Sequence, residues 1–164
     1  MTKANYQGVI EEWVQVHDLT LSLNTSEYAQ HDVLAAPQEL ANVAIVEGGA
    51  VVLQSVRLLD IDDNARAIDL WFFDASASMG AENAAIGPAD SDVVDHLLGV
   101  ISIAAANYTD LANSQEATKV NVGLALQCAS TSRSIWVGAG FRDATGDTYT
   151  ASGITLKLGF LQGM

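Results

Sequence analysis

Apolar and polar side chains alternate along most of this sequence, and this period of two residues constrains the fold more than any other feature. Residues 119–128, KVNVGLALQC, place Val120, Val122, Leu124, Leu126 and Cys128 on one face. The run 154–160 repeats the pattern with Ile154, Leu156, Leu158 and Phe160. Successive side chains of a strand point to opposite faces, so the alternation predicts antiparallel strands with one buried face each.

Eight segments carry a strand signal: 18–24, 40–47, 50–61, 66–75, 99–107, 119–129, 133–142 and 152–162. This number suits an all-β fold, a two-sheet antiparallel sandwich of about eight strands, with a jelly roll as one of its arrangements. Turn residues at 62–64 and in DATGD, 143–147, predict two hairpins. One short helix is predicted in PADSDVVDHLLG, residues 88–99, where acidic residues follow a proline and a glycine marks the end.

The length of 164 residues and the 49% hydrophobic content predict one globular domain with a substantial core. We divide the chain into an N-terminal arm, residues 1–17, and a sandwich domain, residues 18–164. No apolar run reaches the roughly 18 residues of a membrane span, and the N-terminus has no secretory pattern. A single cysteine excludes an internal disulfide, which predicts synthesis in a reducing cytoplasm.

The formal net charge of −13 argues against nucleic acid as a partner, because backbone binding needs clustered Lys and Arg. Only seven such residues occur, and they are scattered. The acidity fits a self-repelling soluble surface or a basic protein partner, and it does not choose between them.

The motif D-x-S-x-S, formed by Asp74, Ser76 and Ser78, matches the metal-binding signature of von Willebrand A-type adhesion domains. That fold requires a long helix after the motif, and here a segment with two glycines and a proline follows instead. We therefore predict that Asp74 ends a strand and that both serines bond to backbone groups of the turn.

Other candidate sites are weaker. DIDDNA, residues 60–65, resembles the start of an EF-hand loop, but Ala65 stands where glycine is needed and Trp71 where glutamate is needed. The histidines His17, His31 and His96 have no metal-ligand spacing, and Cys128 falls in an apolar register. The sequence therefore predicts no cofactor, no metal and no enzymatic activity.

Trp71 and Phe73 lie on the face of a strand opposite to Ile68, Leu70 and Phe72. Two interpretations stay open for these aromatic residues. They form a second core layer beneath a loop or helix, or they lie at a subunit interface, where aromatic residues concentrate.

The chain also resembles a family. The run from TLSLNTSEYAQHDVL to IDLWFFDASASMG, together with GVISIAAANYTDL and YTASGITLKLGFLQ, resembles small structural proteins of tailed bacteriophages. The resemblance covers roughly residues 18–162. It implies a small β-sandwich virion protein with a capsid decoration or cement role, and it supplies no catalytic residues.

We therefore predict a protein that binds the major capsid protein on the outer surface of the virion, as a homo-oligomer, either dimer or trimer. The expected contacts are the arm, the loop 76–89 and the aromatic strand. Their residues are Tyr6, Ile10, Trp13, Trp71, Phe73 and Met79. The main alternative is a tail or fibre module that binds carbohydrate, for which exposed Trp71 or Trp136 should lie beside Asp62 and Asp63. A cupin-like metal enzyme is a further alternative and would need a histidine cluster.

Overall fold

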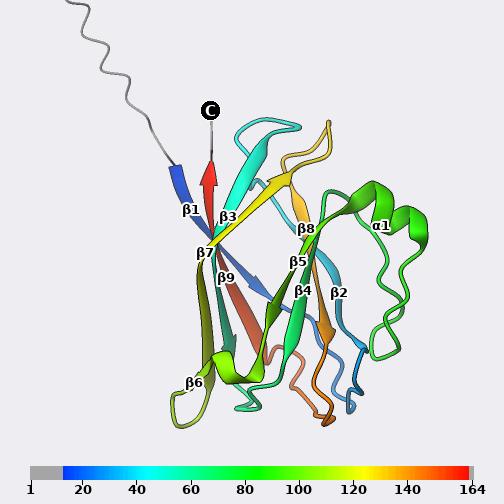
Figure 1. Cartoon of the computed structure of the whole chain (residues 1–164), viewed down its shortest axis with the longest axis vertical. Helices are drawn as coiled ribbons and strands as arrows, with labels where there is room; N and C mark the ends of the chain where they lie inside the picture. Colours follow the sequence, from blue (N-terminus) through cyan, green and yellow to red (C-terminus); the bar gives the residue numbers. More distant parts are fainter. Residues whose placement is uncertain (1–12, 163–164) are drawn as a thin grey trace, which may run out of the picture.

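Two β-sheets pack face to face in the structure, a computed structural model that describes residues 13–162 (Figure 1). The first sheet has the strand order β1-β9-β3-β7-β6 and the second has the order β2-β8-β4-β5, with antiparallel pairing throughout. The predicted all-β, two-sheet antiparallel sandwich is confirmed. The strands are β1 (Trp13–Thr20), β2 (Val33–Leu40), β3 (Ala50–Asp60), β4 (Ile68–Phe73), β5 (Leu97–Ile103), β6 (Tyr108–Asp110), β7 (Gln115–Gln127), β8 (Ile135–Phe141) and β9 (Ile154–Gln162).

The strand pairing is nested from the outside inward. Strand β1 pairs with β9, β2 with β8, β3 with β7, and β4 with β5. A chain paired in this way is one long hairpin rolled into two sheets, which is a jelly roll. The connections β3–β4 and β8–β9 therefore cross from one sheet to the other, and the predicted hairpins at 62–64 and 143–147 were wrong.

Strand β2 lies in a segment that shows no alternation, VLAAPQEL, and contains Pro37. Two register shifts interrupt its pairing with β8. Proline is tolerated here because β2 is an edge strand, where an N–H on the outer side is not needed for the ladder. The strand predicted at 40–47 is mostly a loop, and its apolar character comes from Val43 and Ala44, which are buried.

Residues 13–17, which we assigned to an arm, belong to β1, so that domain boundary was wrong. Strand β1 pairs with β9 in unbroken register from Trp13 to Thr20. Its pattern is inverted, because Val14 and Val16 are exposed while Gln15 and His17 are half-buried on the other side. Because polar residues occupy its inward positions, residues 13–17 lack the apolar inner face that predicts a strand. Residues 1–12, with Tyr6 and Ile10, lie outside the described part of the chain.

The short helix predicted within 88–99 is confirmed as α1 (Asp90–His96), and it is the one α-helix among the described residues. The chain enters β5 directly after it, so Leu97 and Leu98 belong to a strand. None of the α1 side chains is buried. No helix in residues 13–162 is long and apolar enough to cross a membrane.

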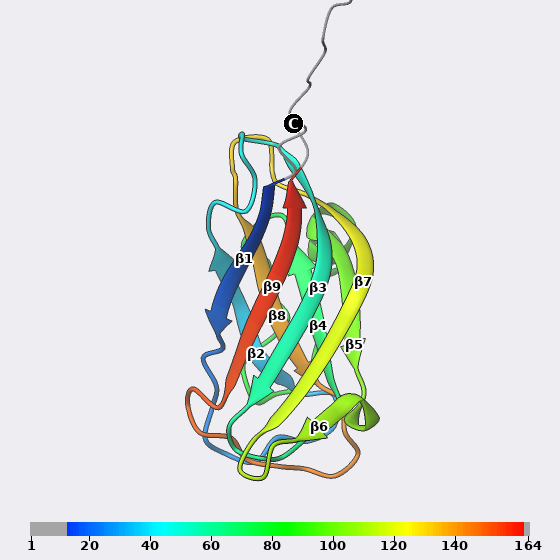
Figure 2. The ribbon, with the colours of Figure 1, turned by 90° about the vertical axis from the view of Figure 1, so that its left-hand side faces the viewer.

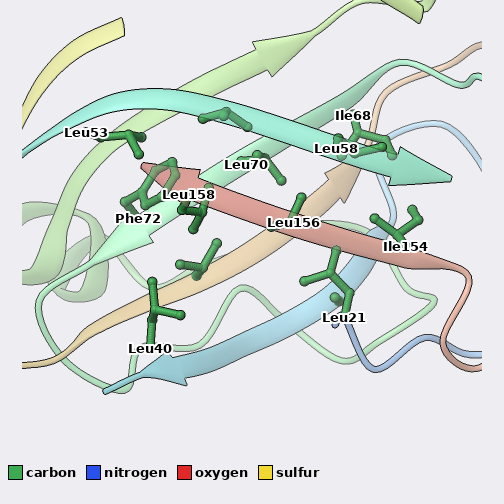
Figure 3. Close-up of a cluster of buried hydrophobic side chains, with 14 of the residues drawn as sticks. Leu21, Leu40, Leu53, Leu58, Ile68, Leu70, Phe72, Ile154, Leu156 and Leu158 are labelled. Atoms are coloured by element: carbon green, nitrogen blue, oxygen red, sulfur yellow. The ribbon is translucent and has the colours of Figure 1, made fainter. Parts of the chain in front are cut away.

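The core lies between the two sheets, where their inward side chains interdigitate (Figure 3). The first sheet contributes fully buried Leu53, Leu58, Leu156 and Leu158, and the second contributes Ile68, Leu70 and Phe72. Burying each such side chain stabilises the fold by about 1.5–3 kcal/mol.

Candidate functional site

The two outer faces of the sandwich differ in what lies over them. Residues 74–96, which join β4 to β5, lie beside the outer face of the second sheet, and we call this side the covered face (Figure 1). The outer face of the first sheet is crossed by no other described segment, and we call it the open face. Figure 2 shows β1, β9, β3 and β7 side by side on this open face.

A second hydrophobic cluster fills the covered face. Its buried members are Val33, Phe73, Ala77 and Met79, with Trp71, Ile86, Leu97 and Trp136 packed around them. Two glycines of β8 make room for the loop. A Cβ atom on Gly138 would lie 2.5 Å from Met79 Sδ, and one on Gly140 would lie 2.6 Å from Ile86 Cδ1.

Burial in this cluster decides between the two interpretations of the aromatic strand. Phe73 and Met79 are 0% exposed, so their assignment to a protein interface was wrong. Trp71 is half-buried and stacks on Phe73 with ring centroids 6.4 Å apart. The aromatic residues therefore form a second core layer beneath a loop. A loop made of small residues is what allows this layer to close.

The D-x-S-x-S motif lies where the covering segment leaves β4. Asp74 Oδ1 is 2.8 Å from His96 Nδ1, and the Gly80 N–H donates to Ser78 Oγ at 3.2 Å. Asp74 directly follows the last residue of β4, so the prediction that it ends a strand is confirmed, as is the backbone bond predicted for Ser78. The backbone bond predicted for Ser76 does not form among residues 13–162, so that part of the prediction was wrong. Within residues 13–162, no three His, Cys, Asp or Glu side chains form a group suited to a metal ion.

The open face carries large aliphatic side chains in water. Val14 and Val16 on β1 are 67% and 64% exposed, and Val120 on β7 is 66% exposed. Half-buried Leu161 and Val52 continue the row that starts at Val14, because the register places Val14 opposite Leu161 and Leu161 opposite Val52. Val120 lies in the neighbouring row, opposite Ser55. An apolar strip therefore runs from β1 across β9 to β3. Exposed aliphatic residues that are contiguous mark interaction sites.

Charges on the open face are balanced. Lys157 Nζ lies 2.7 Å from Asp18 Oδ2, and Arg57 forms two hydrogen bonds to Glu116, of 2.8 and 3.0 Å. The Arg57 guanidinium lowers the pKa of the Glu116 carboxyl. Two acids and two bases give this face no net charge, although the whole chain carries −13. By contrast, residues 74–96 contain five acidic residues and no Lys or Arg.

The acidic turn at 60–64 is closed by its own carboxylates. Asp60 is 0% exposed and accepts the backbone N–H groups of Asp62, Asn64 and Ala65 at 3.0–3.1 Å. Burial raises the pKa of Asp60, against the opposite effect of these hydrogen bonds. Asp62 Oδ2 accepts from Thr150 N at 2.8 Å. These contacts fix the crossing between the sheets.

The pairing proposed for carbohydrate binding does not form. Trp71 and Trp136 are half-buried in the covered-face cluster. Asp62 and Asp63 lie beyond the end of β3, near Ile154, whereas Trp136 lies beside Phe73 at the opposite end of the second sheet. The described structure thus removes the observation on which this alternative depended.

The three histidines are also dispersed. His17 lies in β1 with its ring 5.7 Å from that of Phe160, and burial lowers its pKa. His31 lies in the β1–β2 connection at a φ of 70°, and His96 ends α1. Cys128 is buried, which raises the pKa of its thiol. Among the described residues these groups do not converge on one site.

The two exposed valines of β1 were not predicted to form one face of a strand. The signal was present in WVQVHDLT, where Val14 and Val16 alternate with Gln15 and His17. Of the predicted contact residues on the arm, only Trp13 lies in the described chain, as the first residue of β1 beside Gln162.

Comparisons with known proteins leave the family open. No family model matches the chain, and no curated protein matches its sequence. Among solved structures, it is similar to one described as desmodium yellow mottle tymovirus, with 10% identity and a TM-score of 0.30 over 93% of this chain and 89% of that chain. A similarity at this level assigns no function.

Proposed function

We propose that this protein is a structural component of a tailed-bacteriophage virion, a capsid decoration or cement protein. It binds the shell of the major capsid protein from outside and stabilises that shell as a homo-oligomer. The sequence resemblance supplies this class of function. Because jelly rolls serve many functions, the fold is compatible with the proposal without selecting it.

The open face is the observation that carries the proposal. It is an uncovered sheet surface with exposed Val14, Val16 and Val120 and with no net charge. Burying aliphatic surface drives association, and balanced charges avoid leaving an unpaired charge at the interface. The rest of the acidic surface repels other acidic copies. Shell binding through this face needs no chemical step.

The proposed orientation follows from the difference between the faces. The open face lies toward the shell, and the acidic segment 74–96 lies toward solvent. Strand β1 begins with Trp13 at the edge of the open face, and Ile10 precedes Trp13 by three positions in the sequence. Tyr6 and Ile10 stay proposed shell contacts on this basis, and so does Trp13.

Two matched variants test the face. Val120→Asp places a carboxylate on the open face, and Val94→Asp places one on α1, where Val94 is 81% exposed. We expect Val120→Asp to weaken binding to shells assembled from the major capsid protein of the same phage by at least about tenfold, or about 1.4 kcal/mol. We expect Val94→Asp to bind as the wild type does. Equal binding by all three proteins would contradict the proposed face.

Cryo-electron microscopy of intact virions tests the function itself. The expected result is density for the sandwich in many copies on the outer capsid lattice. Density confined to the tail or to one vertex would contradict the cement role and would support the alternative of a tail or fibre-associated module.

A further inference from the structure

The free edge of β1 differs from every other strand edge in the described sandwich. An edge strand exposes unpaired backbone N–H and C=O groups, and proteins protect such edges with short strands, prolines, bulges, lysines or a covering segment. Strand β1 is eight residues long and has no register shift against β9. It contains no Pro, Gly, Lys or Arg.

The other edge of the first sheet is protected. Strand β6 has only three residues and covers only the start of β7. Beyond it, β7 contains an irregularity, with Asn121 at a φ of 56° and Gly123 at 68°. This bulge and the nearby Lys119 make that edge a poor template for a further strand.

Both edges of the second sheet are protected as well. Strand β2 has Pro37 and two register shifts, and the segment 82–86 bonds along its start, with Val33 N–H donating to Ala84 O at 2.8 Å. Strand β5 has a register shift against β4, and the Leu124 side chain packs close to Gly99.

Hydrogen bonding shows which β1 groups face outward. The Leu21 N–H donates to Ile154 O at 2.9 Å, so odd-numbered residues of β1 bond to β9 and even-numbered residues point their backbone groups away. At the far end, Thr20 O accepts from Gln38 Nε2 at 3.3 Å. The outward groups of Val14, Val16 and Asp18 have no partner among residues 13–162.

We propose that this edge binds the β1 strand of a second copy, antiparallel and across a two-fold axis at Val16. This dimer is a specific form of the homo-oligomer in the proposed function, and in that respect the inference rests on the proposed function. The result is a continuous ten-stranded sheet whose open faces both point the same way. Such a dimer would present both open faces to one shell when its axis is perpendicular to the shell surface.

The register follows from which groups are available. With Val16 opposite its own copy, Val14 lies opposite Asp18 of the partner subunit, and about six backbone hydrogen bonds form. A shift that centres Asp18 would place two carboxylates opposite each other, which is unfavourable. A shift that pairs Val14 with residue 20 would compete with the Gln38 bond to Thr20 O.

Local charge allows a second copy to approach despite the net charge of −13. Asp18 is the only charged residue of β1, and its carboxylate is paired with Lys157 at 2.7 Å. The edge is therefore nearly neutral and is flanked by Val14 and Val16, which gain burial. A symmetric antiparallel pair is self-complementary, as a two-fold contact must be.

Single cysteines test the register in purified full-length protein. In the proposed dimer the two Val16 Cα atoms are about 5.5 Å apart, within disulfide range, whereas the two Val14 Cα atoms are separated by about four residues, or ~14 Å. We expect V16C to form a disulfide-linked dimer in mild oxidant and V14C to do so at least about tenfold more slowly. Wild type, with buried Cys128, is the control for unrelated crosslinks.

Edge variants test the contact without a crosslink. V16P removes an N–H that points away from β9, and V16K adds the charge that protects natural edges. We expect each to shift the dimer toward monomer in analytical ultracentrifugation, raising the dissociation constant at least about tenfold. V120K, with the same change on β7, should leave the dimer intact.

Three outcomes would overturn the inference. The first is that the wild type remains a monomer up to about 1 mM. The second is that V14C crosslinks as readily as V16C. The third is that V16C crosslinks only after residues 2–12 are removed, which would assign the edge of β1 to that segment. No shell is present in these assays, so their failure leaves shell binding through the open face standing. Loss of shell binding in Val120→Asp with crosslinking intact concerns the proposed function alone.

Discussion

The covered face and the open face are the outer surfaces of two similar antiparallel sheets. The apolar residues of the covered face are buried under a loop, whereas those of the open face are exposed to water. On the covered face, Gly138 and Gly140 leave space into which Met79 and Ile86 pack. On the open face, Val14 and Val120 remain in water. Aromatic side chains, which usually suggest an interface, are core here, and the aliphatic residues of a polar-looking strand are the free surface.

The largest expected effect comes from Met79→Ala on the covered face. Met79 is 0% exposed, so truncation leaves a cavity under the loop and should lower the free energy of unfolding by about 3 kcal/mol. Val120→Ala on the open face should change it by less than about 0.5 kcal/mol. Urea denaturation of the wild type and both variants measures these changes in the free energy of unfolding. Equal effects would show that the loop 76–89 does not complete a core layer.

An intermediate effect is expected from Asp60→Ala, because Asp60 fixes the turn that crosses from the first sheet to the second and so keeps the two sheets packed face to face. This change removes the acceptor of three backbone N–H groups, and we expect a loss of about 2 kcal/mol in the free energy of unfolding.

The pH dependence of that loss has a defined sign. Because burial raises the pKa of Asp60, the folded protein holds this proton more tightly than the unfolded chain does. Its contribution to stability is therefore greatest below the ordinary aspartate pKa and declines as the pH rises through the folded-state pKa. The destabilisation by Asp60→Ala should grow as the pH falls, and a loss that shrinks toward acid would contradict this account.

The smallest effect is expected from Glu116→Gln on the open face. The Arg57–Glu116 pair is surface-exposed, so its contribution is small and screened by salt. Arg57 lowers the pKa of Glu116, so any stabilisation is present above the ordinary glutamate pKa and is lost as the pH falls through the folded-state pKa. Thermal melts of both proteins should differ slightly at neutral pH and low salt. They should coincide in acid or at about 1 M salt. A difference that persists in both conditions would show that the charge pair is not its cause.

Some strands were predictable because their environment is simple. In β9 the buried residues Ile154, Leu156 and Leu158 alternate with half-buried ones, as the sequence predicted. Strand β7 departs from its predicted pattern partway along. Val120 was placed with Leu124 on the inner face, but the bulge at Asn121 and Gly123 turns it outward. An inserted residue reverses every later side chain of a strand, and nothing in the period of KVNVGLAL reveals it.

The candidate site was less predictable than the fold. Phe73 and Met79 looked like contact residues because their strand and loop carry apolar groups on a second face. Whether that face is free depends on where residues 74–96 return, and this is set by contacts with Val33 and Trp136, which are distant in the chain. The edge of β1 was hidden for a related reason, since half-buried Gln15 and His17 gave it the pattern of a polar arm.

The sequence by itself determined the class of fold, an antiparallel sandwich, and the approximate positions of most strands. It could do so because alternation is a local property of each strand and burial of one face is its direct cause. Only the tertiary structure decided the nested pairing, the covering of one sheet, and the unprotected edge of the other. These features depend on which segments, distant in the sequence, come into contact. Those contacts form in competition with many other possible contacts, so no single stretch of residues determines them.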